Sequence, residues 1–90
     1  MRNKLRRWIA KNYFYIDKPS VMIPDFTGDM NAALRVLQRM ADNYLFCASC
    51  HSDMCGVYDT DAQDWVSLDE DGPMAICLAA YRVREGKEWD

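Results

Sequence analysis

Residues 26–51, FTGDMNAALRVLQRMADNYLFCASCH, change from a helical to a strand-like pattern of apolar residues. Before Asn43 the apolar residues recur every three or four positions, which predicts a helix that Thr27 or Asp29 caps. Its buried stripe is predicted to contain Met30, Ala33, Leu34, Leu37, Met40 and Ala41. After Asn43 the apolar residues alternate, which predicts a strand. One short stretch therefore predicts a mixed fold of helices and strands.

Two more strands and a helix are predicted downstream. A turn near residues 52–53 precedes MCGVYD (54–59), and a loop at 59–62 precedes QDWVSLDE (63–70). Three consecutive strands with short polar turns predict an antiparallel meander. Pro73 then suits the first position of a helix, PMAICLAAYRVRE. One face of this helix is predicted to contain Met74, Cys77, Leu78 and Tyr81, and its alanines allow close approach to a neighbour: Ala75, Ala79 and Ala80.

Upstream, residues 3–14, NKLRRWIAKNYF, predict a short amphipathic helix, and residues 16–26 predict an extended connector. The element order is helix, helix, three strands, helix. We therefore predict an α+β fold with helices packed on a three-stranded antiparallel meander sheet. Ninety residues predict a single domain over 1–90. In it, residues 1–20 form the basic N-terminal helix and the start of the connector, and residues 25–84 form the sandwich core.

The composition limits the class of protein. Half of the residues are hydrophobic and 28% are charged, which is typical of an ordered globular chain. No run approaches the ~20 apolar residues of a membrane helix, and the basic N-terminus lacks the pattern of a secretory signal. We therefore expect a cytoplasmic protein without membrane association, whose four cysteines are mostly reduced thiols.

The net charge of -3 conceals a separation of charge along the chain. Residues 1–20 contain six basic residues and one acidic residue, whereas residues 53–71 contain seven acidic residues and no Lys or Arg. This segregation has two interpretations: two solvated faces that keep the protein soluble, or a surface for an oppositely charged partner. The acidic segment is the denser of the two and the better candidate for a partner.

The cysteine cluster CASCH (47–51) has the spacing of a c-type haem site, and its thiols are also candidates for redox chemistry. Its residues, together with one thiol further along, offer four soft zinc ligands: Cys47, Cys50, His51 and Cys55. However, adjacent residues of a strand point to opposite faces, so Cys50 and His51 share one ion only in a tight loop. The preferred interpretation, without a cofactor, is that Cys50 and Cys55 are small buried side chains, with Cys50 pointing inward and His51 near the rim.

Two other sequence patterns give weaker evidence for a binding site, one for calcium and one for nucleic acid. Residues 59–70 place oxygen ligands much as an EF-hand loop does, but Asp64 stands where that loop needs glycine, which favours a plain acidic hairpin. The basic N-terminal helix offers charge and aromatic rings to nucleic acid, but the overall acidity argues against direct binding. No catalytic constellation is visible, because His51 is the only histidine and has no nucleophile partner. We therefore expect a protein that is not an enzyme.

The segments FTGDMNAALRVLQRM (26–40) and DGPMAICLAAYRV (71–83) together resemble the phage ABA sandwich family of small phage and prophage proteins. The resemblance covers roughly residues 25–84. It implies a sandwich fold and a phage gene, and it implies helix-to-sheet packing for Ala75–Cys77 and Ala79–Ala80. It brings no catalytic residues, and the cysteine cluster has no counterpart in the family pattern.

The expected function is therefore non-enzymatic. We expect a phage protein that acts in the host cytoplasm and inhibits a host protein or nucleoprotein complex, as an anti-CRISPR protein does. The predicted partner-binding residues are Asp53, Asp59, Asp61, Asp64, Trp65, Asp69, Glu70 and Asp71. The alternatives are a phage accessory or assembly protein that self-associates, for example as a homodimer, and a small zinc-binding module.

Overall fold

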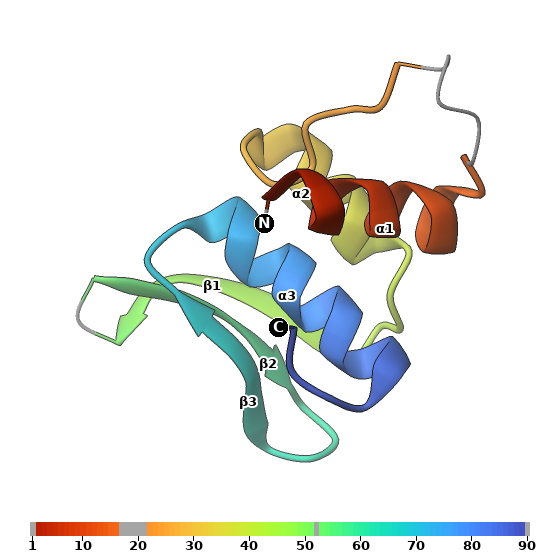
Figure 1. The fold of residues 1–90 in the computed structure, drawn as a ribbon. Coiled ribbons are helices and arrows are strands. Elements are labelled where there is room, and N and C mark those ends of the chain that lie inside the picture. Colours follow the sequence, from red (N-terminus) through yellow and green to blue (C-terminus); the bar gives the residue numbers. More distant parts are fainter. Residues whose placement is uncertain (1, 17–21, 52, 90) are drawn as a thin grey trace.

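The computed structural model describes residues 2–16, 22–51 and 53–89, without the side chains of residues 49–51. Figure 1 shows helices on one side and a sheet on the other. In chain order the elements are α1 (Arg2–Phe14), α2 (Met30–Gln38), β1 (Tyr44–His51), β2 (Met54–Asp59), β3 (Asp64–Asp69) and α3 (Gly72–Glu85). This order confirms the predicted α+β class.

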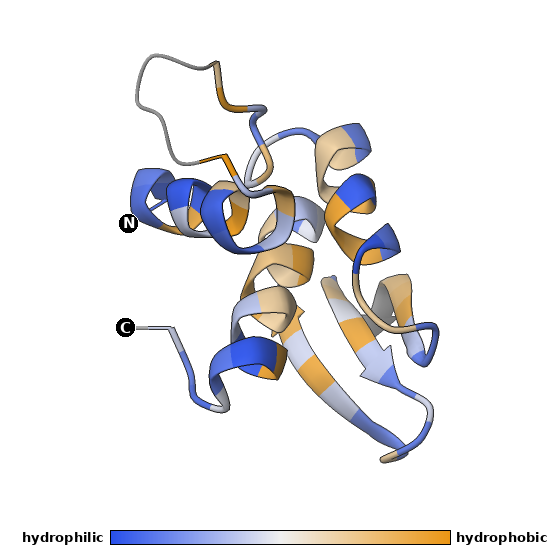
Figure 2. Cartoon of the chain, turned by 90° about the vertical axis from the view of Figure 1, so that its right-hand side faces the viewer, coloured by the Kyte–Doolittle hydropathy of each residue, from blue (hydrophilic) through white to orange (hydrophobic). Residues whose placement is uncertain are grey.

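The sheet is an antiparallel meander in the order β1-β2-β3. Its strands alternate between more and less hydrophobic residues along their length (Figure 2), as expected for a sheet with one covered face. The register of β2 and β3 shifts between Val57 and Tyr58, so Val66 is an extra residue in β3. Its carbonyl oxygen accepts a hydrogen bond from Arg82 Nη1 at 2.9 Å. The last turn of α3 therefore binds the irregular point of β3.

Helix α3 lies between the sheet and the other two helices. It packs on β2 and β3 with one side, while α1 and α2 contact it from above in Figure 1. A helix with neighbours on two sides is apolar around much of its circumference, and α3 has seven buried residues in its 14 positions. The sequence predicted one buried face. The residues for which the resemblance implied packing, Ala75, Ile76, Ala79 and Ala80, are also buried, whereas Leu78 is only half-buried.

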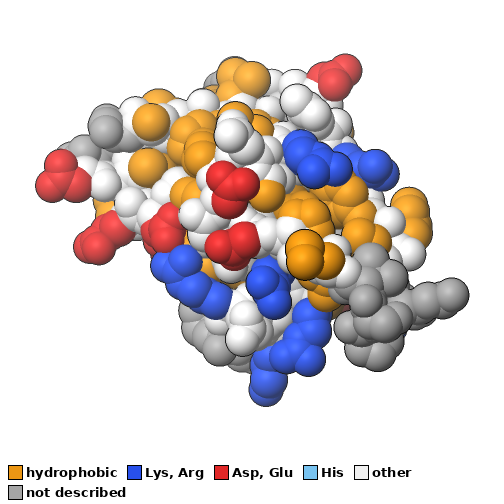
Figure 3. Space-filling model, turned by 90° about the horizontal axis from the view of Figure 1, so that it is seen from above, with side chains coloured by type: hydrophobic (Ala, Val, Ile, Leu, Met, Phe, Trp, Pro, Cys, Tyr) orange, Lys and Arg blue, Asp and Glu red, His pale blue; other side chains and the backbone are white. Residues whose placement is uncertain are grey.

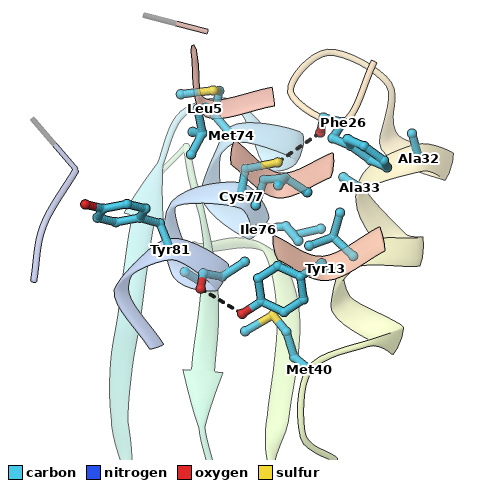
Figure 4. Packing of buried hydrophobic residues seen from close by; sticks show 14 of the residues in the cluster. Leu5, Tyr13, Phe26, Ala32, Ala33, Met40, Met74, Ile76, Cys77 and Tyr81 are labelled. Atoms are coloured by element: carbon cyan, nitrogen blue, oxygen red, sulfur yellow. Dashed lines mark hydrogen bonds between the residues drawn. The ribbon is translucent and has the colours of Figure 1, made fainter. Parts of the chain in front are cut away.

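Two buried hydrogen bonds fasten the outer segments to α3 (Figure 4). The hydroxyl of Tyr13, in α1, donates to the carbonyl oxygen of Ala80 at 2.8 Å. The thiol of Cys77 donates to the carbonyl oxygen of Phe26 at 3.1 Å. Around these contacts, the largest fully buried side chains are Phe26, Leu5, Ile9, Ile76, Val36 and Val57. One core therefore joins all the described helices to the sheet.

Asp29 is the cap of α2. Its backbone is extended and its Oδ1 accepts a hydrogen bond from the amide of Asn31 at 3.3 Å. The buried face of α2 differs from the predicted stripe, since Ala32 and Val36 are buried while Leu34 and Leu37 are only partly buried. Ala41 is exposed because the helix has already ended at Gln38. The presence of this helix was therefore predicted correctly, but its buried face is shifted by about one residue from the predicted stripe.

Candidate partner-binding surface

All the described helices lie on one side of the sheet, and its opposite side is uncovered (Figures 1 and 2). Cross-strand partners share a face, so the register assigns two rows of three residues to the uncovered side. We call this surface the open sheet face, and it consists of Leu45, Tyr58, Trp65, Cys47, Gly56 and Leu68. Val57, between Gly56 and Tyr58 in the chain, is fully buried on the opposite face. Within residues 2–16, 22–51 and 53–89, no segment therefore covers this apolar patch.

The centre of the open sheet face is closely packed. A Cβ added to Gly56 would lie 2.7 Å from Leu68 Cδ2 and 2.9 Å from Trp65 Cε3, so both side chains cover the glycine. The rings of Tyr58 and Trp65 meet edge to face, with centroids 5.0 Å apart. Leu45 is 54% exposed and Leu68 is 39% exposed. The face therefore presents ordered aromatic rings with exposed aliphatic groups beside them.

The predicted acidic residues lie at two opposite ends of the sheet. Asp59, Asp61 and Asp64 belong to the hairpin between β2 and β3. The others lie at the far end, where Asp53 precedes β2 and where Asp69, Glu70 and Asp71 end β3 and lead into α3. The six residues of β2 separate the two ends by about 17 Å. This exceeds the screening length at ordinary ionic strength, about 8–10 Å, so each end acts separately.

Only some of these carboxylates are available to a partner. Asp53, Asp61, Asp64 and Glu70 are exposed. Asp69 Oδ1 instead accepts the amide of its neighbour Asp71 at 2.9 Å. Asp71 Oδ2 in turn forms an ion pair with Arg2 at 2.6 Å.

Asp59 holds the hairpin together. Its Oδ1 accepts hydrogen bonds from Asn43 Nδ2 at 2.8 Å and from the amides of Asp61 and Ala62 at 2.9 and 3.3 Å. The Asn43 bond, opposed by desolvation and supported by the two amides, lowers the pKa of Asp59. Its role in the described structure is therefore to organise the turn.

The hairpin end contains a shallow pocket of about 260 Å³ between the sheet and the last turn of α3. It brings together three predicted site residues, Asp59, Asp64 and Trp65, with Arg82. The remaining lining residues are Tyr44, Ala62, Val66 and Val83. Arg82 forms an ion pair with Glu88 at 2.9 Å in addition to its bond to β3. Trp65 thus belongs both to this pocket and to the open sheet face.

The zinc candidates are only partly described. The side chains of Cys50 and His51 lie outside the described residues. Cys47 pairs with Gly56, whereas Cys55 precedes Gly56, so the two described thiols project from opposite faces of the sheet. Both are free and half-buried. Among the described residues, no group of three or more His, Cys, Asp or Glu side chains is placed to hold a metal ion.

The helical side of the molecule contains the basic helices. Figure 3, which looks onto the helices, shows Lys and Arg side chains together with hydrophobic and acidic ones. Neither α1 nor α2 contains an Asp or Glu. The exposed Asp25 and Asp29 lie just before α2, so this side of the fold carries charges of both signs.

The sequence model of the phage ABA sandwich domain matches residues 2–81 of this 90-residue chain. The chain belongs to the phage ABA sandwich domain family. This small phage protein therefore matches its family from α1 onward, whereas the motifs in residues 26–40 and 71–83 indicated a resemblance that began near residue 25. Neither the curated proteins nor the solved structures gave a significant match. Within the described residues, this phage ABA sandwich protein has no helix long and apolar enough to cross a bilayer.

Sequence reasoning identified Trp65 of the open sheet face but missed Leu45, Tyr58 and Leu68 as surface candidates. The alternation in residues 44–51 already placed Leu45 and Cys47 on one side of the predicted strand. With Cys50 predicted to point inward, that side was the outward one, but the alternation did not show which residues of the other two strands lie beside Leu45. The register across Gly56 supplies that information.

Proposed function

We propose that this phage protein is a non-enzymatic binding protein that docks its open sheet face onto a basic surface of a host protein. The observation that carries the proposal is the uncovered apolar face itself, with Leu45 and Leu68 exposed beside the Tyr58–Trp65 pair. An apolar centre with aromatic anchors and a charged rim is the usual anatomy of a protein interface.

Charge selects the class of partner. Residues 44–71, which include the whole sheet, contain no Lys or Arg, and exposed carboxylates stand at both ends of the strands. A basic groove, such as the nucleic-acid channel of a host defence complex, is complementary to this arrangement. Binding there would compete with nucleic acid, as an anti-CRISPR inhibitor does in the host cytoplasm.

The same charges disfavour a second copy as the occupant. Sheets that pack face to face keep their strands within about 30° of each other. Because both ends of this sheet are acidic, parallel and antiparallel stacking alike would bring carboxylates of two copies together. Like charges across an interface reduce affinity. A homodimer through the open sheet face is therefore the less favoured arrangement.

The test begins with capture of host proteins on the immobilised phage protein, followed by purification of the captured protein and direct binding measurements. We expect Trp65→Ala and Leu45→Ser each to weaken binding about tenfold or more. Leu45 is exposed, so its substitution should leave the fold intact even if Trp65→Ala does not. Met22→Ser is the matched control, because Met22 is 92% exposed but lies outside the sheet.

A second set of variants tests the contribution of the exposed carboxylates. Asp61→Asn with Asp64→Asn, and separately Asp53→Asn with Glu70→Gln, should slow association and reduce its dependence on salt. Equal binding by wild type, Leu45→Ser and Trp65→Ala would contradict the proposal. A stable dimer in sedimentation that Leu45→Ser dissociates would assign the face to self-association instead.

A further inference from the structure

A second surface lies on the helical side, where the C-terminal ends of the three described helices meet. It is an open pocket of about 360 Å³, which we call the arginine pocket. Asn12 and Tyr13 come from the last turn of α1, Arg39 from the C-cap of α2 and Arg84 from the last turn of α3. Tyr15, just beyond α1, completes the lining.

The two arginines are fixed by the end of α1. Arg84 Nη1 donates to the carbonyl oxygen of Asn12 at 2.6 Å, and its guanidinium lies 4.9 Å from the ring centroid of Tyr13. Arg39 Nη1 donates to the carbonyl oxygen of Tyr13 at 3.3 Å. These carbonyls lack partners within the helix, so the bonds cap α1. A guanidinium carries five N–H donors, so capping leaves donors on both arginines for a ligand in the pocket.

Tyr15 follows the end of α1 and presents its ring to solvent. Its φ is +58°, in the left-handed region that costs a non-glycine residue about 1–2 kcal/mol, and its side chain is 79% exposed. Glycine is the residue usually found at such a helix end. The left-handed backbone turns the chain so that the amide of Ile16 donates to the carbonyl oxygen of Ala10 at 2.9 Å, and the Tyr15 ring is left exposed beside the two arginines.

Three basic residues lie along the exposed side of α1, the helix whose end lines this pocket. Lys4, Arg7 and Lys11 are exposed and recur at spacings of three and four, so they lie along one side of the helix. Lys11 stands four residues before Tyr15. The net charge of -3 argued against nucleic acid, and Asp71 pairs with Arg2 at the start of α1. The arginine pocket lies at the other end of that helix, and its described lining contains two guanidinium groups and no carboxylate.

We propose that the arginine pocket and the basic row of α1 bind single-stranded nucleic acid. Arg39 and Arg84 hold one phosphate, a neighbouring base stacks on Tyr15, and Lys4, Arg7 and Lys11 follow the adjoining backbone. Basic grooves with an aromatic stacking platform bind single strands with little sequence preference. This site uses the helices and is independent of the open sheet face.

The test is fluorescence anisotropy of a labelled oligodeoxythymidylate of about ten nucleotides at low salt. Tyr15→Gly should bind about tenfold more weakly while the fold is kept, because glycine adopts a positive φ without strain. Tyr15→Phe keeps the ring and should bind as the wild type does. Arg39→Gln and Arg84→Gln should each weaken binding and reduce the slope of log affinity against log salt by about one.

Lys87→Gln is the matched control, since it removes one positive charge after α3 outside the pocket. It should leave binding nearly unchanged. The proposal is overturned if no binding occurs at low salt, if Lys87→Gln weakens binding as much as Arg39→Gln does, or if duplex DNA binds as tightly as the single strand. The proposal is also overturned if inorganic phosphate displaces the oligonucleotide as effectively as thymidine monophosphate does, because the base would then contribute nothing to binding.

Discussion

At the residue scale, Ala10 and Tyr13 complete the inner side of α1 beside Leu5 and Ile9. The spacing of apolar residues in 3–14 predicts Trp8 and Asn12 on the side of Leu5 and Ile9, but both are only half-buried. The difference arises because α1 packs on α3 rather than on the sheet, and a one-dimensional pattern does not reveal the neighbour. Likewise, Tyr13 is buried with a hydroxyl whose partner, Ala80, lies 67 positions away.

Ile76 is fully buried in α3 between the sheet and the other helices, so its truncation should be costly. We expect Ile76→Ala to lower the free energy of unfolding by about 2–5 kcal/mol, because the cavity has little freedom to collapse. Val83→Ala, at a position 39% exposed on the same helix, should change it by about 0.5 kcal/mol or less. Urea unfolding measures both, and equal effects would refute the central position of α3.

Cys77 should be the inert thiol among the described cysteines. Burial, with further contributions from Asp25 and Asp71, raises the pKa of Cys77 from its ordinary value of 9.0 to about 12. A raised pKa means stability that is fully present below about pH 9 and is lost as the pH rises toward 12. In native protein near neutral pH, a thiol reagent should leave Cys77 unmodified.

Mass spectrometry of the labelled peptides checks this. Labelling of Cys77 in the folded protein at the rate seen in urea would contradict its burial. Cys77→Ala should weaken the alkaline loss of stability relative to the wild type.

At the element scale, the sequence predicted every described helix and strand, because the change of period near Asn43 and the turn signals are local. The sequence did not predict the register of the strands. The extra residue Val66 in β3 depends on the pairing with Val57 and Tyr58, which are remote in sequence. Which face of the sheet remains open depends in turn on where α3 packs. Turn chemistry and hydrophobic period are local signals, whereas register and layer order are not.

A substitution at Gly56 in β2 tests how closely the strands of the open sheet face are packed. A methyl group there would lie 2.8 Å from the carbonyl oxygen of Ser67, as well as against Leu68 and Trp65. We expect Gly56→Ala to destabilise the protein by about 1–3 kcal/mol, because backbone atoms cannot move away without disturbing β3. Gly28→Ala is a useful comparison, since its closest contacts are to the side chain of Asp25 alone. A Gly56→Ala protein as stable as the wild type would show that the strands are less closely paired.

The hairpin between β2 and β3 should respond to acid through Asp59. Because its pKa is lowered in the folded state, Asp59 stabilises the protein above its unfolded pKa, and this contribution is lost as the pH falls through the folded value. Asp59→Asn keeps an oxygen acceptor and should flatten the acid part of a thermal stability profile. Asp53→Asn, at an exposed turn, should leave that profile as it is. Identical profiles for wild type and Asp59→Asn would contradict the role of Asp59 in the turn.

At the scale of the whole molecule, the basic residues of the N-terminal segment lie on α1, and the acidic segment lies in the sheet and at its ends. Exposed carboxylates of that segment stand at both ends of the sheet. The sequence predicted the acidic segment as one site. The fold divides it, because a meander alternates the direction of its strands and sends consecutive turns to opposite ends. The apolar centre between those ends is what the sequence alone did not show.

The central claim is that the open sheet face is the docking surface, and Cys47 is a reporter within it. Cys47 belongs to the open sheet face and Cys55 to the opposite side. The most direct measurement is the labelling rate of each thiol by mass spectrometry, in the free phage protein and in its complex with the purified host protein. The account predicts that complex formation slows labelling of Cys47 at least about tenfold and leaves Cys55 unchanged. Labelling of Cys47 at the same rate in the complex as in the free protein would contradict it.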